Sequence, residues 1–189
     1  MNNPLDLNSV ITTTQEILAQ LLVMDIADVN EHSSILEDLG ADSLDIVDLS
    51  FQLGRHYGCT LPKTSVLDHA VAVLGDVGDL VEKGRITPAG VELLEHSLSA
   101  FAPKQLRSGM QPAEIFAATT VRNWATQCYR MFDYLPTTCP ECEADLACLN
   151  DRRQVVCCGC SARLTPMEGD EISRHLVEQF AASRLPKVV

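Results

Sequence analysis

The sequence has few aromatic residues, few basic residues and no long hydrophobic run. Aromatic residues make up 5% of its 189 residues, with a single tryptophan. No apolar stretch approaches the roughly 20 residues of a membrane-spanning helix, so we expect no membrane span. The polar start, MNNPLDLNS, lacks the basic and apolar regions of a signal peptide. These absences predict a soluble, cytoplasmic protein whose length suits one ordinary domain plus a small appendage.

The scarcity of basic residues is confined to the first part of the chain. The formal net charge is −12. Residues 1–84 contain 14 acidic and 3 basic residues, net −11, whereas residues 85–189 contain 12 acidic and 11 basic residues, net −1. Acidic surfaces attract basic partners and repel nucleic acid. Acidity also keeps a chain soluble, but five acidic residues cluster around Ser43, where we expect a docking surface: Glu37, Asp38, Asp42, Asp45 and Asp48.

Residues 36–44, LEDLGADSL, place Ser43 at the start of an expected helix. Asp42 is a favourable N-cap for that helix. Ser43 would then lie at the positive end of the helix dipole, which favours a phosphate ester. The spacing of four apolar residues predicts the buried face of the helix: Leu44, Val47, Phe51 and Tyr57.

This stretch resembles the attachment site of acyl carrier proteins, in which the serine of a D-S-L motif receives 4'-phosphopantetheine from coenzyme A. The resemblance covers about residues 10–65 and includes LEDLGADSLDIVDLSFQLGRHYGCTLP. It implies a helical bundle that carries groups and is not an enzyme. The implied partners are a phosphopantetheinyl transferase, which modifies Ser43, and acyl-loading, condensing or acyl-transfer enzymes with basic docking patches. Family members often continue the second helix with glutamates, whereas this chain has Arg55 and His56, which leaves open whether its partners are those of housekeeping fatty-acid synthesis.

Apolar periodicity predicts further helices on both sides of this motif. The first covers about residues 9–22, capped by Asn8 or Ser9, and a short helix covers about residues 65–74. Thr87, followed by a proline, is a favourable start for another helix.

Two segments compete to be the final helix of the carrier bundle, residues 76–81 and residues 120–132. The second lies in an amphipathic stretch that contains the tryptophan and is too apolar to be a linker. We therefore expect a carrier-like domain over residues 1–134, with a core at 1–84 and a helical extension or insertion at 85–134.

Cysteine spacing gives the second strong signal. Two C-x2-C pairs are separated by 14 residues: Cys139 with Cys142, and Cys157 with Cys160. Four thiolates fill a tetrahedral zinc site, and the residues between the pairs predict a hairpin around residues 150–151. Residues 135–165 thus resemble a zinc ribbon with one structural Zn²⁺, since no coordination position is left for water or substrate. One alternative is that these cysteines form disulfides, which are disfavoured in the cytosol. Another is a redox C-x-x-C motif, but the βαβ pattern that would accompany it is missing.

The other cysteines are assigned to packing. Cys148 is expected to be a small buried residue of the hairpin, Cys158 a non-ligand, and Cys59 and Cys128 core residues. The five histidines have no metal-binding spacing.

Two other functions compete with that of a carrier. A zinc ribbon often binds nucleic acid, but residues 139–165 have a net charge of −1, which is not the basic footprint of a nucleic-acid reader. This leaves, as the alternative, a protein-interaction or nucleic-acid-binding adaptor whose carrier-like domain is not loaded. A serine hydrolase is disfavoured because Ser43 lacks the G-x-S-x-G context and is surrounded by carboxylates.

The sequence therefore predicts a mainly α protein. It comprises an acyl-carrier-like helical bundle with extra helices, a zinc ribbon, and a terminal helix at about residues 170–183 within a last segment of 166–189. We expect it to hold an acyl or aminoacyl group as a thioester on 4'-phosphopantetheine at Ser43, in specialised fatty-acid, lipid or secondary-metabolite synthesis. The ribbon would serve folding or partner interaction.

Overall fold

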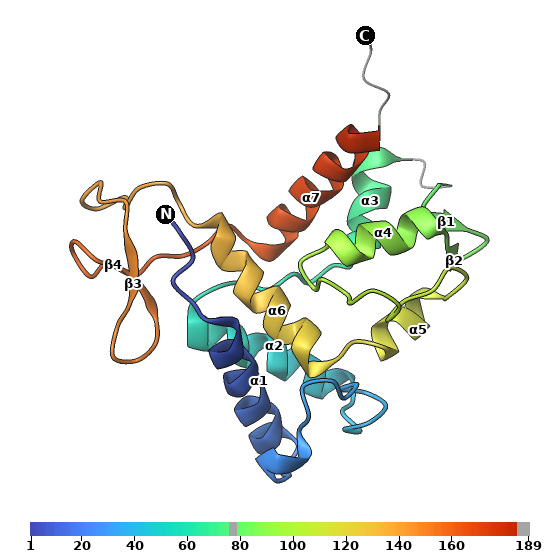
Figure 1. Ribbon diagram of the computed structural model, residues 1–189, viewed down its shortest axis with the longest axis horizontal. Coiled ribbons are helices and arrows are strands. Elements are labelled where there is room, and N and C mark those ends of the chain that lie inside the picture. Colours follow the sequence, from blue (N-terminus) through green and yellow to red (C-terminus); the bar gives the residue numbers. More distant parts are fainter. Residues whose placement is uncertain (76–78, 185–189) are drawn as a thin grey trace.

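The computed structural model describes residues 1–75 and 79–184, and over these the chain is mainly α-helical with two small antiparallel hairpins (Figure 1). Its helices are α1 (Leu7–Leu21), α2 (Ser43–Tyr57), α3 (Val66–Leu74), α4 (Pro88–His96), α5 (Pro112–Ala117), α6 (Val121–Met131) and α7 (Gly169–Arg184), with short 3-10 turns η1 (Ile26–Asp28) and η2 (Phe132–Tyr134). Its strands are β1 (Val81–Glu82), β2 (Arg85–Ile86), β3 (Ala147–Leu149) and β4 (Val155–Cys157). Among the described residues, we find no helix with the length and apolar character needed to span a membrane.

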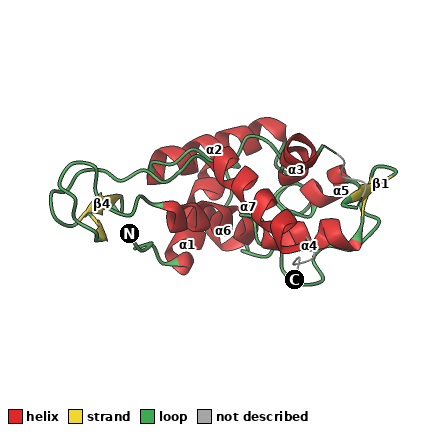
Figure 2. Ribbon diagram, turned by 90° about the horizontal axis from the view of Figure 1, so that it is seen from above, coloured by secondary structure: helices red, strands yellow, loops and turns green. Residues whose placement is uncertain are grey.

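The two hairpins lie at opposite ends of the molecule, and the helices fill the space between them (Figure 2). Strand β1 pairs with β2, and β3 pairs with β4 with Cys148 opposite Val156. The second hairpin confirms the turn predicted around residues 150–151. The first was not predicted, because two-residue strands leave almost no alternation to detect.

Helix α1 begins two residues earlier than predicted. The cap is Asp6, whose carboxylate accepts a hydrogen bond from the backbone N–H of Ser9 at 2.9 Å. The prediction of Asn8 or Ser9 as the cap was wrong. Aspartate caps a helix as well as asparagine or serine does, and Asp6 accepts the hydrogen bond of the third N–H of the helix.

The buried face predicted for α2 was largely wrong. Leu44, Val47 and Phe51 are 75%, 66% and 63% exposed, and only Tyr57 of that set is buried. The residues that α2 buries are Ile46, Leu49, Leu53 and Tyr57. Both sets repeat at helical spacing, so periodicity alone could not choose between them. The contact between α1 and α2 determines which of the two sets is buried, and it leaves the other apolar set of α2 outside the core.

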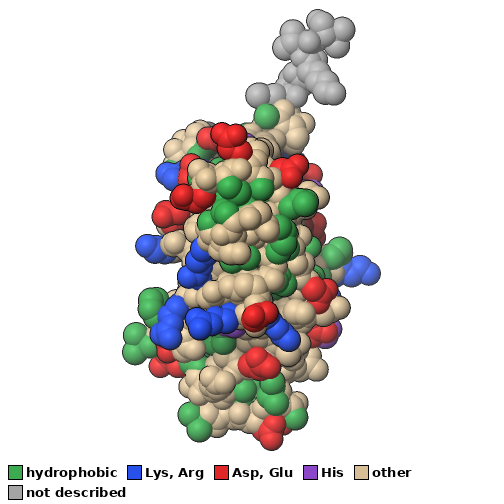
Figure 3. All heavy atoms as spheres, turned by 90° about the vertical axis from the view of Figure 1, so that its left-hand side faces the viewer, with side chains coloured by type: hydrophobic (Ala, Val, Ile, Leu, Met, Phe, Trp, Pro, Cys, Tyr) green, Lys and Arg blue, Asp and Glu red, His purple; other side chains and the backbone are tan. Residues whose placement is uncertain are grey.

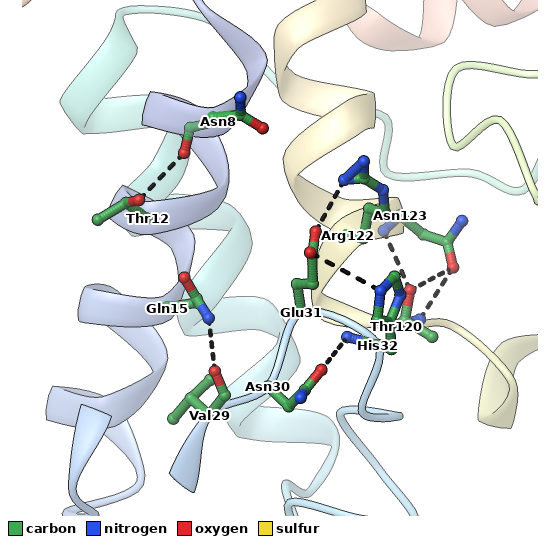
Figure 4. Close-up of polar contacts among 10 residues, drawn as sticks. All are labelled: Asn8, Thr12, Gln15, Val29, Asn30, Glu31, His32, Thr120, Arg122 and Asn123. Atoms are coloured by element: carbon green, nitrogen blue, oxygen red, sulfur yellow. Dashed lines mark hydrogen bonds and ion pairs between the residues drawn. The ribbon is translucent and has the colours of Figure 1, made fainter. Parts of the chain in front are cut away.

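Helix α6 is one of the two candidates for closing the bundle, and it packs against α1. The loop after α1 links the two helices (Figure 4): Gln15 Nε2 donates to the carbonyl of Val29 at 2.6 Å, and Arg122 Nη1 donates to Glu31 at 2.7 Å. The rival segment, residues 76–81, begins with three residues outside the described part of the chain and continues into β1.

The amphipathic stretch at 112–132 forms two α-helices, α5 and α6. Helix α5 ends at Ala117, and Thr120 caps α6 through a reciprocal pair of hydrogen bonds with Asn123. Elsewhere the predicted starts are confirmed, since Ser65 caps α3 and Thr87 caps α4 through their hydroxyl oxygens.

Two hydrophobic clusters stabilise the fold. The first joins α1, α2 and α6 and also contains residues of the cysteine-rich segment: Cys139, Val155, Cys157 and Leu164. The second joins α3, α4, α5 and α7 and contains Leu67, Leu93, Phe101, Ile115, Val177 and Phe180. The cysteine-rich segment therefore shares the core of α1, α2 and α6 and has no separate core of its own.

Helix α7 confirms the predicted terminal helix and packs against α3. Its first turn is tied to the carrier-like part by Asp170, whose Oδ1 accepts hydrogen bonds from the backbone N–H groups of Lys63 and Thr64 at 3.0 and 3.1 Å. The same oxygen lies 3.0 Å from Nε2 of the buried His69. Gly169 makes the close approach possible, since a Cβ there would lie 2.3 Å from the backbone of Pro62.

Candidate functional site

Ser43 is the first residue of α2, and its side chain is exposed. Asp42 Oδ1 accepts hydrogen bonds from the N–H groups of Leu44 and Asp45 at 2.7 and 3.0 Å, and Asp45 Oδ2 accepts one from the N–H of Asp42 at 2.8 Å. This capping box fixes the helix start, so Ser43 is presented on a rigid first turn at the positive end of the helix dipole.

The acidic residues predicted for docking do not all have the same surroundings. Glu37, Asp38, Asp42 and Asp48 are exposed, whereas Asp45 is half-buried and acts in the capping box. Asp38 also accepts a hydrogen bond from the N–H of Ser34 at 2.7 Å, so it holds the loop before α2. Among the described residues, the Asp48 carboxylate accepts one hydrogen bond, from Gln52 of its own helix, and the exposed Glu37 carboxylate accepts none, so these two acids are the most available to a partner.

A cavity of about 1020 Å³ lies beside Ser43, which is one of its lining residues. One wall comes from α2 and the segment that follows it, including Val47, Phe51 and Leu67. The opposite wall comes from α4, α5 and the start of α6. The first wall extends to Leu67 and the opposite wall begins at Leu94. Because the two walls come from separate parts of the chain, local sequence patterns did not predict the cavity.

The four cysteines predicted to bind metal come together. Their Sγ atoms all lie within 4.8 Å of one another, with 3.7 Å between Cys139 and Cys160 and 3.5 Å between Cys142 and Cys157. Four sulfurs around one Zn²⁺, each about 2.3 Å from the ion, lie about 3.8 Å apart. The observed spacing therefore fits a tetrahedral zinc site.

The two cysteine pairs adopt the same local turn. In each, the N–H of the first cysteine donates to a carbonyl five residues later: Cys139 to Ala144 at 2.7 Å, and Cys157 to Ala162 at 2.8 Å. The residue after each second cysteine, Glu143 and Ser161, is left-handed, with φ of 62°. The same turn, present at both cysteine pairs, is the kind of zinc knuckle that brings two thiolates to one ion.

The protonation of these thiols depends on the turns. Backbone hydrogen bonds from Cys160 and Gly159 lower the pKa of Cys157 to about 7, although burial opposes them. A backbone hydrogen bond from Ala144 lowers the pKa of Cys142, but hydrogen bonds with the neighbouring thiols outweigh it and raise that pKa to about 12. One thiolate thus forms easily, and a cation that binds all four thiolates must displace the remaining protons.

Cys148 and Cys158 differ from what the sequence predicts. They were expected to be a packing residue and a non-ligand, both reduced, but the structure joins them in a disulfide across the hairpin, with Cα atoms 5.3 Å apart. They stay outside the four-sulfur cluster. The expectation that Cys59 and Cys128 are core residues is confirmed, and their sulfurs lie 4.0 Å apart.

The cysteine-rich end of the molecule carries a short band of basic side chains with acidic ones above and below it (Figure 3). Arg152, Arg153 and Arg163 are exposed there. Arg163 also reaches the end of α2, where Gly58 leaves room for it: a Cβ at Gly58 would lie 2.4 Å from the guanidinium. Gly58 has φ of 79°, so it serves as both helix end and contact point.

Comparison with known proteins agrees with this geometry. A family model described as the phosphopantetheine attachment site matches residues 13–73, the stretch that holds Ser43. The acyl carrier proteins of Helicobacter pylori strains G27 and HPAG1 are each 35% identical to this chain over 68 residues, which is 36% of this chain and 81% of theirs. No solved structure matches the chain significantly.

Proposed function

Because the chain belongs to the acyl carrier protein family, we propose that Ser43 is the residue that bears 4'-phosphopantetheine and that the loaded protein holds an acyl group as a thioester. The chain is accordingly a carrier and not an enzyme. The observation that carries the proposal is an exposed serine on the capped first turn of α2, inside the matched region and beside a large cavity.

The surroundings of Ser43 suit a phosphate ester. The hydroxyl is exposed, so a transferase can reach it, and the ester forms between its Oγ and the phosphate of the arm with loss of the nucleotide half of coenzyme A. The helix dipole favours negative charge at this position. Bound there, the arm supplies a thiol for thioester formation.

Partner enzymes would dock on the α2 side of the molecule. Leu44 directly follows Ser43, and Asp48 lies little more than one turn further along α2; both are exposed, so this surface offers an apolar contact and a negative charge. Such a surface suits enzymes with a basic patch around an apolar depression, among them the transferase and acyl-loading, condensing or acyl-transfer enzymes. We assign the carrier to specialised fatty-acid, lipid or secondary-metabolite synthesis, since Arg55 and His56 replace the usual acidic end of the helix and so disfavour the partners of housekeeping fatty-acid synthesis. We place it in the cytoplasm, as expected from the sequence.

The four cysteines would hold one structural Zn²⁺. The fit of the sulfur distances supports this role, and so does the presence of Cys139 and Cys157 in the first hydrophobic cluster. Four thiolates leave no open position, so the ion would stabilise the fold.

Intact-mass spectrometry tests the carrier function directly. Incubation with coenzyme A and a broad-specificity phosphopantetheinyl transferase should add one arm per chain, and Ser43→Ala should add none. Ser50→Ala, which removes another serine of α2, is the matched control and should be modified like the wild type. Modification that persists in Ser43→Ala, or a wild type that several transferases leave unmodified, would contradict the proposal.

The adaptor remains the second candidate, and the exposed basic band at the cysteine-rich end is the observation that favours it. It predicts a protein or nucleic-acid partner that binds equally well to Ser43→Ala, and pull-down with that variant separates the two functions.

A further inference from the structure

Cys148 and Cys158 form a pair that the four-cysteine site does not use. Their sulfurs are bonded, and their Cα atoms lie 5.3 Å apart, within the range of about 4.4–6.8 Å that a disulfide requires. Neither sulfur belongs to the four-sulfur cluster, whose members stay close together while this bond is formed. The disulfide and a complete metal site are therefore compatible within one structure.

This pair lies where a small molecule can reach it. Cys148 is half-buried in β3, and the exposed Cys158 directly follows β4, at one end of the molecule (Figure 1). Cys59 and Cys128 offer a comparison: their sulfurs lie 4.0 Å apart, but both side chains are buried and both thiols are free. Of these two pairs among the described residues, the accessible one is bonded and the buried one is not.

The disulfide also joins the two zinc knuckles to each other. The first knuckle ends at Ala144, three residues before β3, which holds Cys148. In the second knuckle Cys158 comes directly after Cys157, and its N–H donates to the carbonyl of Leu146 at 3.0 Å. The covalent bond thus holds the second knuckle against the strand that continues the first, which keeps the two halves of the metal site together.

Such a bond changes the chain most when the metal site is empty. Cys148 and Cys158 are ten residues apart, so the bond closes a loop that contains the whole turn of the hairpin. Closing a loop of this length removes chain entropy from the disordered state. Because metal binding and folding of such a unit are linked, the cross-linked chain loses less entropy when Zn²⁺ binds. The loop length corresponds to a gain of at most about a hundredfold in affinity.

We propose that Cys148 and Cys158 form a reversible redox site, a dithiol that exchanges with low-molecular-weight disulfides of the glutathione class, and that its oxidation tightens the binding of Zn²⁺. Disulfides of cytoplasmic proteins are usually transient, catalytic or redox-sensing, so the location proposed above favours a reversible bond. The tightening rests on the proposed zinc site, whereas the exchange itself does not.

The exchange proceeds in two balanced steps. The exposed sulfur of Cys158 attacks oxidised glutathione, breaks its S–S bond, releases one glutathione thiol and leaves a mixed disulfide. The sulfur of Cys148 then attacks Cys158 in this mixed disulfide and releases the second glutathione thiol. The two cysteines lose two electrons and two protons, and the two glutathione thiols take up both.

Thiol counting on the full, zinc-loaded chain tests the redox site. The chain is equilibrated with reduced or oxidised glutathione, denatured in a chelator with a maleimide, and weighed intact. The reduced chain should carry eight labels and the oxidised chain two fewer. Cys148→Ala should stop at the first step and carry one glutathione. Cys59→Ala, which removes one thiol of the buried pair, is the matched control and should still lose two labels on oxidation.

Competition with a zinc chelator measures the coupling. In the wild type, oxidation should lower the dissociation constant for Zn²⁺ by at most about a hundredfold. In Cys148→Ala oxidation should not lower it, and in Cys59→Ala it should lower it as in the wild type. Circular dichroism should show both variants folded.

Each outcome bears on a different part of the inference. Eight labels in oxidised glutathione, or a disulfide that reduced glutathione does not open, overturn the reversible redox site. Release of Zn²⁺ together with the two thiols also overturns it, because the metal ligands would then be the oxidised groups. Equal dissociation constants for the reduced and oxidised chains overturn the coupling alone. A reduced chain that binds no Zn²⁺ overturns the proposed metal site and the coupling, while the label count still decides the redox site by itself.

Discussion

Phe132 is the residue whose truncation best tests how the carrier bundle is completed. It follows α6 and is fully buried, and its ring lies edge-on to that of Tyr57 on α2, with centroids 6.3 Å apart and planes at 65°. The family match ends at residue 73, so a residue this late in the chain would be dispensable for a self-sufficient carrier core. We expect Phe132→Ala instead to destabilise α1 and α2 strongly.

The magnitude follows from burial. Truncating a fully buried phenylalanine costs about 3–5 kcal/mol, a figure that includes the aromatic pair contribution of about 0.5–1.5 kcal/mol. Domains of this kind have a total stability of about 5–15 kcal/mol, so the loss is a large fraction of it. At about 2–4 °C per kcal/mol, the thermal midpoint should fall by about 6–20 °C.

Urea unfolding followed by circular dichroism measures this change, with Phe116→Ala as the control. Phe116 is 46% exposed, so the same truncation there should cost about 1 kcal/mol or less. Alkaline titration gives a local readout: burial raises the pKa of Tyr57 to about 12, and loss of the neighbouring ring should bring that pKa down. A small cost together with an unchanged Tyr57 titration would refute the view that α6 and η2 complete the bundle.

Three further predictions concern charge and metal. Asp48→Lys should slow loading in a salt-dependent way, and Asp28→Lys, at the exposed last residue of η1, should not; stopped-flow loading at two ionic strengths measures this. Burial raises the pKa of Asp170, but hydrogen bonds from His69, Thr64 and Lys63 outweigh it and hold the pKa below its ordinary value. The stability of the folded protein should therefore fall as the pH drops below about 4. Acid unfolding curves should show a smaller fall for Asp170→Asn. Cys157→Ser should lose the zinc and Cys148→Ser should keep it, by elemental analysis.

Local chemistry made much of the fold predictable from the sequence. Asp42, Ser65 and Thr87 are caps that act within three residues, so the starts of α2, α3 and α4 were correct. The spacing of the cysteine pairs likewise predicted the sulfur cluster, because each pair forms its own turn.

Tertiary contacts could not be predicted in the same way. The stripe of α2 with Val47 and Phe51 has the periodicity of a core face, yet it lines a cavity opposite residues of α4 and α5. Nothing in either segment alone says that they face each other. The disulfide between Cys148 and Cys158 could not be predicted either, since it depends both on the register of β3 and β4 and on the turn at Cys157 and Cys160.

The shared core has a consequence for the zinc site. Cys139 and Cys157 belong to the same buried cluster as Leu18 and Leu49, so the free energy of metal binding is not confined to the hairpin. A ribbon with its own core would unfold alone when the metal is removed and leave the carrier helices intact. If zinc binds here, its removal would also loosen a side of α1, α2 and α6, because the buried Cys139 and Cys157 would lose the cation that ties them to the exposed Cys142 and Cys160. Chelation should therefore lower the thermal midpoint of the helices themselves, and helices that melt at the same temperature with and without zinc would show that the two parts are energetically independent.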